Sequence, residues 1–305
     1  MAIAAPAETD GAAPAASLDA LMPRDMASKA SQVGEQKAGA GALNTFVLGI
    51  LAGAFIGLGA MFATLLGAGA QDIPFWIARL LSGIAFSLGL ILVVVAGAEL
   101  FTGNNLIVMT WAEKRVPLRR LLRNWALVYG GNFVGAVATA ALVYAGKQYA
   151  FGDASVGANA LKIAETKAGL GFGQAVALGI LCNALVCLAV WLCYSARSVA
   201  DKVLAIVFPI TAFVAAGFEH SVANMYFLPE GLMIRNWAPD SFWHTAGTSA
   251  TAYPNLTVGH ALWANLLPVT LGNIFGGAVM VGLVYWLVYL RGSATPTAQA
   301  RAVRR

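Results

Sequence analysis

Six long apolar stretches dominate this chain, and each is long enough to cross a lipid bilayer as a helix. They occupy approximately residues 44–68, 75–98, 118–146, 169–195, 203–228 and 263–290. A hydrocarbon core about 30 Å thick requires roughly 20 helical residues. Only 11% of the 305 residues are charged, whereas soluble domains carry about 25%. The sequence therefore predicts an all-α, multi-pass membrane protein and argues against a soluble enzyme.

Basic residues are distributed unevenly between the two sides of these spans. Fourteen fall at the N-terminus, in the loops after the second and fourth spans, and at the C-terminus, whereas four fall on the other side. Loops rich in Lys and Arg stay in the cytoplasm. We therefore expect both termini to be cytoplasmic, in a bacterial inner membrane. The net charge of +5 then reflects topology, and no nucleic-acid partner is expected.

The segments outside the spans divide the chain into four parts. Residues 1–16 are rich in Ala and Pro and are predicted to be disordered. Residues 17–43 predict an amphipathic helix that is capped by Ser17 and lies on the cytoplasmic face. Residues 44–291 make up the six-helix domain, and residues 292–305 are a basic cytoplasmic tail.

The first three spans resemble the last three. Spans 1 and 4 share Leu-Gly-Ile-Leu at 48–51 and 178–181, and spans 3 and 6 each carry two asparagines eight residues apart. The hexamers at 99–104 and 219–224, in spans 2 and 5, both read Glu-x-x-x-x-Asn. Inverted repeats of three spans place a functional site near the bilayer midplane, between interrupted helices. The sequence predicts two inverted three-helix repeats whose second and fifth helices are interrupted at these hexamers, with unwinding at 102–105.

The ionisable groups of the two hexamers are the main candidates for a functional site. His220 is the only histidine within a span, and ionisable groups at that depth default to a functional interpretation. It can donate a hydrogen bond to an anion or carry a proton; the alternative is a purely structural histidine. Glu99 and Glu219 are expected to accept hydrogen bonds from the exposed amides of the opposing half-helix, with proton relay as the alternative.

Further polar residues have more than one interpretation. Lys167, just before span 4, is either an interfacial anchor or a cation that attracts anions to an outer vestibule. Cysteines 182, 187 and 193 share one span and are expected to act as small apolar residues. No metal or cofactor motif is present, so none is expected to bind. The asparagines expected to satisfy the interrupted backbone or each other are Asn104, Asn132, Asn183, Asn224 and Asn273; Asn183 is also placed to touch the substrate.

Four segments resemble the formate–nitrite transporter family, and bacterial formate channels in particular. They are Glu99-Leu100-Phe101-Thr102, Gly-Asn-Phe-Val-Gly at 131–135, Gly-Phe-Glu-His-Ser-Val-Ala-Asn-Met at 217–225, and Leu-Pro-Val-Thr-Leu-Gly-Asn at 267–273. The resemblance extends from about residue 18 to residue 292. It implies an aquaporin-like six-helix protomer in a homopentamer, with one pore in each protomer.

The resemblance also implies roles for individual residues. Thr102 and His220 would meet at the pore centre, and Lys167 and Asn183 match polar positions of the outer vestibule and pore. The implied apolar constrictions are Phe86, Leu90, Leu100, Phe101, Val186 and Phe213. The N-terminal helix is implied to gate the pore and to contact a formate-producing lyase.

The predicted function is bidirectional passage of formate, either passive or coupled to protons, without enzymatic activity. Dehydrating a bare carboxylate in an apolar constriction is costly, so His220 either protonates formate or, with Thr102, hydrogen-bonds it. Nitrite, hydrosulfide and lactate are alternative substrates, because they are also small anions of weak acids. An intramembrane enzyme or sensor is a second class, but no nucleophile or cofactor site is recognisable near His220.

Overall fold

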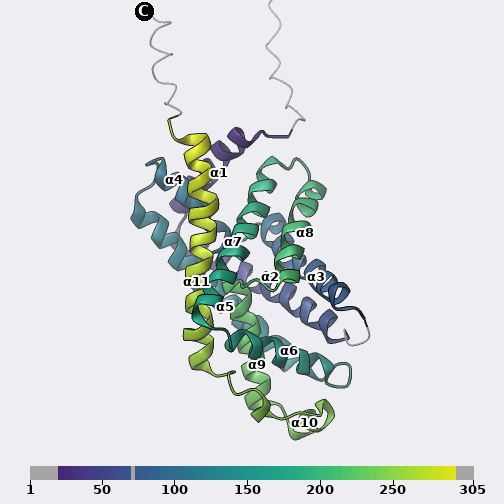
Figure 1. The fold of residues 1–305 in the computed structure, drawn as a ribbon. Helices are drawn as coiled ribbons and strands as arrows, with labels where there is room; N and C mark the ends of the chain where they lie inside the picture. The colour runs from purple at the N-terminus through teal and green to yellow at the C-terminus, as the bar shows by residue number, and fades with distance from the viewer. Residues whose placement is uncertain (1–19, 70–72, 293–305) are drawn as a thin grey trace, which may run out of the picture.

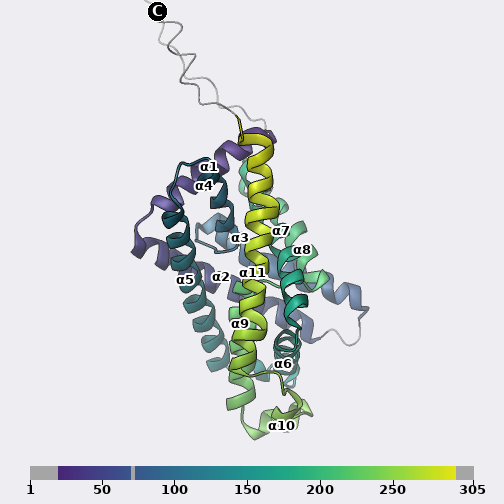
Figure 2. The ribbon, with the colours of Figure 1, turned by 60° about the vertical axis from the view of Figure 1, so that its left-hand side comes forward.

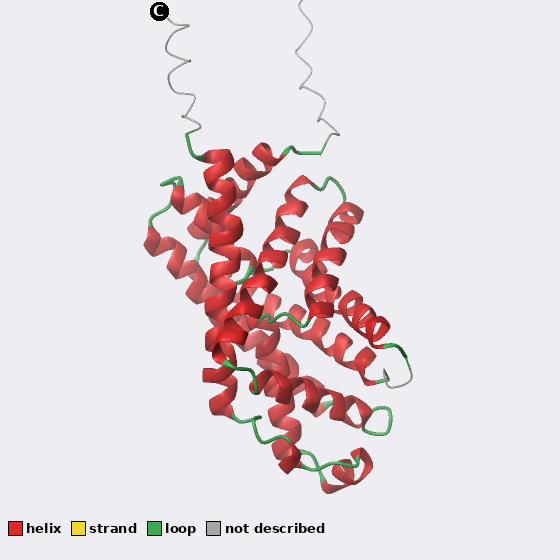
Figure 3. Ribbon diagram, viewed as in Figure 1, coloured by secondary structure: helices red, strands yellow, loops and turns green. Residues whose placement is uncertain are grey.

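The computed structural model describes residues 20–69 and 73–292, and all regular structure within these residues is helical (Figure 3). Among the described residues, six helices are long and apolar enough to span a membrane. They are α2 (Ala42–Ala68), α3 (Phe75–Ala96), α5 (Leu118–Ala145), α7 (Phe172–Ser195), α8 (Val199–Ala216) and the continuous helix His260–Leu290, which contains α11 (Leu267–Ile274). They match the predicted spans within a few residues, except that α8 is only the first part of the predicted fifth span.

Both predicted interruptions are present, but they begin several residues before the predicted unwinding. After α3, Gly97 adopts a left-handed conformation with φ of 85°, and after α8, Gly217 does the same with φ of 74°. A glycine in this conformation ends a helix by allowing a turn that disfavours other residues. The chain resumes as a tight 3₁₀ turn, η2 (Gly103–Ile107), followed by α4 (Val108–Ala112) in the first repeat. The prediction of unwinding at 102–105 was therefore wrong for most of that segment.

In the second repeat the break is shorter. The chain resumes at α9 (Ser221–Trp237), directly after His220. The predicted fifth span of 203–228 thus joins the end of α8, a non-helical break and the first turns of α9. A hydropathy profile could not separate these three parts, because the break spans only residues 217–220, between two apolar helical segments.

Each repeat also begins with an amphipathic helix that precedes its first span. In the first repeat this is α1 (Pro23–Gly39) and in the second it is α6 (Ser155–Ala168), a helix additional to the six spans predicted within residues 44–291. The start of α1 also differs from the prediction, because Met22 and not Ser17 is the N-cap. Met22 is extended, as is usual before a proline, and Pro23 starts the helix. Ser17 and the predicted disordered tail lie outside the described residues, as does all but residue 292 of the basic tail.

The two amphipathic helices lie at opposite ends of the molecule. Figures 1 and 2 show α1 and α4 near the C-terminal end of the yellow helix, whereas α6, α9 and α10 (Asp240–Ala246) gather near its other end. This placement agrees with two inverted repeats. We refer to the two ends below as the α1 end and the α10 end.

Glycines allow the membrane helices to pack with their backbones in contact. A Cβ atom added at Gly135 in α5 would overlap the carbonyl oxygen of Ile50 in α2, and one added at Gly53 would overlap that of Asn132. In the second repeat, Gly276 is equally close to the carbonyl oxygen of Ile180 in α7. Small residues at helix contacts allow this approach in membrane proteins.

We expect Gly135→Ala to destabilise the protein by about 1–3 kcal/mol, because the new methyl group can be accommodated only if α2 and α5 move apart. Gly130→Ala in the same helix is the matched control, since its Cβ would meet only Phe46 Cε2, at 3.7 Å. Thermal unfolding of the detergent-solubilised variants measures the difference. Equal midpoints for the two variants would contradict the close contact of these backbones.

Candidate functional site

The two interrupted helices meet at a buried contact between Thr102 and His220. The Thr102 hydroxyl oxygen and His220 Nε2 lie 2.9 Å apart, and the two residues are 0% and 2% exposed. Thr102 ends the break after α3, and His220 ends the break after α8. The fold thus brings together the two residues that the family resemblance places at a pore centre.

His220 is held in one tautomer by the start of α9. Its Nδ1 accepts a hydrogen bond of 3.0 Å from the backbone amide of Ala223, so the ring caps the helix. A ring nitrogen that accepts a hydrogen bond carries no proton, so the neutral ring carries its proton on Nε2 and donates it to the Thr102 hydroxyl. The structure therefore presents an N–H donor at the contact between the breaks.

Two asparagines hold the non-helical segments in place. Asn132 Oδ1 accepts a hydrogen bond from the Phe101 amide, and Asn273 Oδ1 accepts one from the Ser221 amide, both at 2.9 Å. Each asparagine Nδ2 donates to one carbonyl in the first span of its repeat and to one in the break, at 2.8 and 2.9 Å. As expected, these asparagines satisfy backbone groups that the interruptions leave free.

Glu219 lies at the centre of a polar network on the α10 side. Its carboxylate pairs with Lys167 Nζ at 2.7 Å and accepts hydrogen bonds from the amides of Asn224 and Asn265, at 2.6 and 3.2 Å. The expected partners, the backbone amides of the opposing half-helix, do not donate to the Glu99 or Glu219 side chains in residues 20–69 and 73–292, so that prediction was wrong. Backbone amides at the interruptions donate instead to Asn132 Oδ1, Asn273 Oδ1 and His220 Nδ1.

Glu99 has the same surroundings on the α1 side. It pairs with Lys37 at 3.2 Å and accepts a hydrogen bond of 2.6 Å from the amide of Asn104, which also donates to Asn124 at 2.9 Å. Sequence analysis missed Lys37. The signal was present, because Lys37 and Lys167 are separated by 130 positions, as are the two Leu-Gly-Ile-Leu segments at 48 and 178.

A cavity of about 410 Å³ opens on the α10 side of the contact. It is lined by His220 and Lys167 together with an aromatic group that includes Phe86 and Phe213. The rings of Phe86 and Phe213 meet edge to face with centroids 5.4 Å apart, and Phe213 stacks on His220 at 6.0 Å. An anion in this cavity would thus meet a cation, then an apolar constriction, and then the imidazole.

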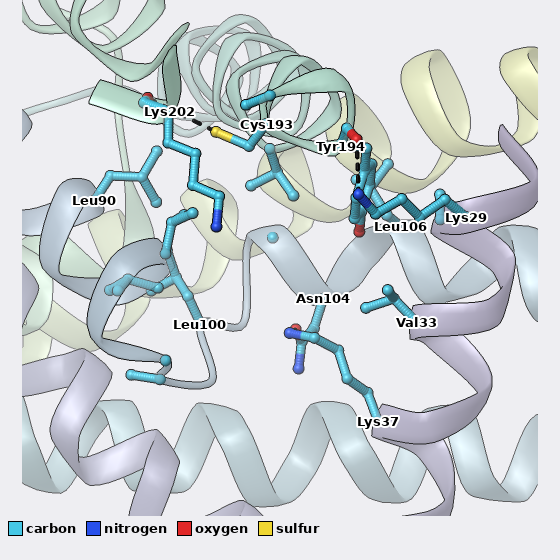
Figure 4. A pocket seen from close by; sticks show the side chains of 18 of the residues that line it. Lys29, Val33, Lys37, Leu90, Leu100, Asn104, Leu106, Cys193, Tyr194 and Lys202 are labelled. Atoms are coloured by element: carbon cyan, nitrogen blue, oxygen red, sulfur yellow. Dashed lines mark hydrogen bonds between the residues drawn. The ribbon is translucent and has the colours of Figure 1, made fainter. Parts of the chain in front are cut away.

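A second cavity, of about 540 Å³, opens on the α1 side (Figure 4). Its lining includes the apolar side chains of Leu90 and Leu100 and the cationic side chains of Lys29, Lys37 and Lys202. Figure 4 shows the Lys202 side chain extending into this space from the side opposite Lys37. Buried apolar residues and the Thr102–His220 contact separate the two cavities, which is the arrangement of a pore with a central barrier.

Four predicted pore residues line neither cavity: Thr102, Phe101, Val186 and Asn183. Phe101 packs edge to face on Trp125 and Tyr129, with centroids 6.1 and 4.9 Å apart. Val186 and Asn183 are 1% and 0% exposed, and neither borders the two cavities described above. In this conformation the side chains of Phe101, Val186 and Asn183 are buried in the protein and do not border either cavity.

Asn183 instead connects the two repeats. Its Nδ2 donates to the carbonyl oxygen of Asn273 at 2.6 Å, to Asn105 Oδ1 at 2.8 Å and to the carbonyl oxygen of Thr102 at 3.3 Å. The thiol of Cys187, one turn further along α7, also donates to the Thr102 carbonyl. The placement of Asn183 and Cys187 fits a role in holding the break.

Comparison with known proteins identifies close relatives. The chain is 45% identical to the formate channel FocA of Escherichia coli (strain K12) over 273 residues, which cover 90% of this chain and 96% of that protein. It is 38% identical to the formate channel FocA of Haemophilus influenzae, over 87% of this chain and 93% of that one.

Solved structures agree with this result. A pentameric formate channel with formate bound superimposes with a TM-score of 0.78 at 45% identity, covering 82% of this chain and 98% of that one. An ion channel of the FNT family superimposes with a TM-score of 0.73 at 29% identity, covering 87% and 98%. The model of the formate/nitrite transporter family matches residues 24–287. This chain is therefore a multi-pass membrane protein that belongs to the formate/nitrite transporter family.

Proposed function

We propose that this chain forms a channel that carries formate in both directions across a bacterial inner membrane. The observation that carries the proposal is the buried Thr102–His220 contact between two cavities, each of which contains a lysine paired with a glutamate. Relatives named as formate channels, at 45% and 38% identity, support formate as the substrate.

Passage requires the anion to lose water at an apolar barrier. Formate entering from the α10 side first meets Lys167, whose ammonium group lies beside the Glu219 carboxylate, and then the ring pair of Phe86 and Phe213. Dehydration of a full charge among apolar groups is costly. His220 reduces this cost because its Nε2–H is oriented to donate to an oxygen at this point, where it now donates to Thr102. Transfer of the Nε2 proton from the imidazolium form of His220 would leave a neutral ring and let neutral formic acid cross, whereas a hydrogen bond from the neutral ring would stabilise the anion.

Orientation and assembly are also part of the proposal. The α1 end carries most of the basic residues, which favours its placement in the cytoplasm together with both termini. Large apolar side chains such as Phe208 and Trp263, 73% and 70% exposed, lie on the membrane helices and are available to lipid or to neighbouring protomers. Because the similar formate channel is pentameric, we propose a homopentamer with one pore in each protomer.

Contact between the N-terminal helix and a formate-producing lyase remains a prediction. One face of α1 is buried against η2 and α4, whereas Arg24, Asp25 and Glu35 are exposed. A partner that binds this polar face would act directly on the element that supplies Lys37. Pull-down of a purified lyase with wild-type protein and with an Arg24→Glu/Asp25→Lys variant tests this contact.

Uptake by proteoliposomes tests the channel proposal. We expect stopped-flow light scattering to record faster entry of formate than of nitrite or hydrosulfide at equal concentration and pH, with empty liposomes as the control. If nitrite or hydrosulfide enters faster than formate, the faster anion is the preferred substrate and the proposal of formate is wrong. Absence of flux for all three anions would contradict a channel and favour a sensor or enzyme.

A further inference from the structure

The α1-side cavity contains far more positive than negative charge. Lys29, Lys37 and Lys202 line it, and Glu99 is the one acidic residue among the described residues that line it. These lysines come from α1 and α8, so that two separate parts of the chain bring cations to one place. Convergence of like charges is unfavourable unless a counter-charge is present.

Two of these ammonium groups, those of Lys29 and Lys202, have no acidic partner within residues 20–69 and 73–292. Lys37 is compensated, since it pairs with Glu99 at 3.2 Å and donates to Asn104 at 2.8 Å. Lys29 donates only to the neutral carbonyl oxygen of Tyr194, at 2.9 Å. Lys202 Nζ makes no ion pair and no hydrogen bond with any residue in the described part of the chain, and Figure 4 shows it extending into the open space. A single monovalent anion would compensate only one of them.

The size and position of the cavity select among anions. Its volume of about 540 Å³ is within the range of pockets that hold metabolite-sized ligands, whereas formate has only three heavy atoms. At its inner side, Leu90 and Leu100 are 2% and 3% exposed and close the path to Thr102. An anion with two or more charges can reach the lysines, but it cannot lose its water to pass these leucines. It would remain in the cavity and obstruct the pore.

We propose that this cavity is a binding site for small multivalent oxyanions, such as phosphate or a dicarboxylate, which block the α1 entrance of the pore. Lys202 and Lys29 would each contact one oxygen, and Lys37 would stay with Glu99. Because the multivalent anion is held at the entrance and not carried, it inhibits entry from this side by competing with the permeant anion. The binding part of this proposal is independent of the substrate, and the inhibition part rests on the proposed formate channel.

Binding is tested directly on the full-length protein in detergent by isothermal titration with inorganic phosphate and, separately, with succinate. At constant ionic strength, we expect Lys202→Met to weaken binding by at least about tenfold and Lys202→Arg to restore most of it. Lys147→Met is the matched control, because it removes the same charge from an exposed position at the α10 end of the molecule. The two ligands distinguish a phosphate-selective site from a general one.

Two results would overturn the site: no heat of binding for either ligand at millimolar concentrations, or equal affinity in wild type and Lys202→Met. Gel filtration and thermal unfolding confirm that each variant is folded, and the arginine variant keeps the comparison valid if the methionine variant unfolds.

Inhibition is then measured as formate flux with phosphate on one side of the proteoliposome at a time. We expect inhibition from one side only, reduced in Lys202→Met and unchanged in Lys147→Met. Normal binding without any formate flux would reject the proposed substrate and retain the site. Normal flux and binding without inhibition would reject the blocking role.

Discussion

Formate flux through the His220→Phe variant is expected to fall by about a hundredfold, with loss of its pH dependence. Phenylalanine keeps the ring that stacks on Phe213, but it cannot donate a hydrogen bond to the permeating anion or accept one from the Ala223 amide. Loss of a buried donor at a barrier, together with an unpaired amide, costs about 1–3 kcal/mol. Stopped-flow uptake between about pH 4 and pH 8, around the unperturbed range of histidine, measures both effects.

His220→Asn separates hydrogen bonding from proton transfer. Asparagine is a good helix N-cap and also carries N–H donors, so it replaces both contacts of the imidazole but does not titrate. If His220 donates a proton, flux in this variant should be low and independent of pH. If His220 only hydrogen-bonds the anion, flux should stay near the wild-type level. Lys167 and Glu219 border the same cavity and are kept in both variants, so they do not account for a difference between them.

Unchanged flux with unchanged pH dependence in His220→Phe would contradict both mechanisms. A fall in flux caused by misfolding is recognised because His220→Asn, which keeps the cap, should unfold at the wild-type temperature.

Lys167→Met is expected to destabilise the protein by about 3–5 kcal/mol, because it leaves the Glu219 carboxylate buried without a cation. The Lys167 and Glu219 side chains are only 14% and 5% exposed. Thermal or denaturant unfolding of the purified protein measures the effect. The double variant Lys167→Met/Glu219→Gln should regain most of the lost stability, because it removes both charges.

The equivalent pair on the α1 side is the matched comparison. Lys37 and Glu99 are 28% and 14% exposed, so water screens them more. We expect Lys37→Met to cost less than Lys167→Met. Equal losses for the two variants, or no recovery in the double variant, would contradict a pair whose importance depends on burial.

Hydrophobic length and repeated residues were enough to predict the membrane topology. The spans were predictable because a bilayer requires about 20 apolar residues whatever surrounds them. The two repeats were visible because Glu99 and Asn104 recur as Glu219 and Asn224. The breaks were predicted at the polar hexamers, which begin at Glu99 and Glu219. The helices end two residues earlier, at Gly97 and Gly217, which adopt the left-handed conformation.

Partners that are far apart in the sequence could not be predicted in the same way. Glu99 and Glu219 were expected to bind half-helix amides, but Lys37 and Lys167 reach them from the amphipathic helices that precede each repeat. Helix α6 was missed because it is short and polar compared with the spans: its 14 residues include Lys162, Glu165 and Lys167, so no long apolar stretch marks it. Phe101 shares a sequence motif with Leu100, but only Leu100 lines a cavity.

From the sequence alone it follows that this chain crosses a membrane six times in two inverted repeats, and that the interrupted segments carry the ionisable groups Glu99, Glu219 and His220. These properties follow from local composition, because the bilayer penalises charge and free backbone groups wherever they occur. Three relations required the tertiary structure: Thr102 faces His220, His220 carries its proton on Nε2, and Lys202 extends into a cavity without an acidic partner of its own in the described residues. Such relations depend on which helices pack together, and residues 118 positions apart come into contact only when the whole fold is formed.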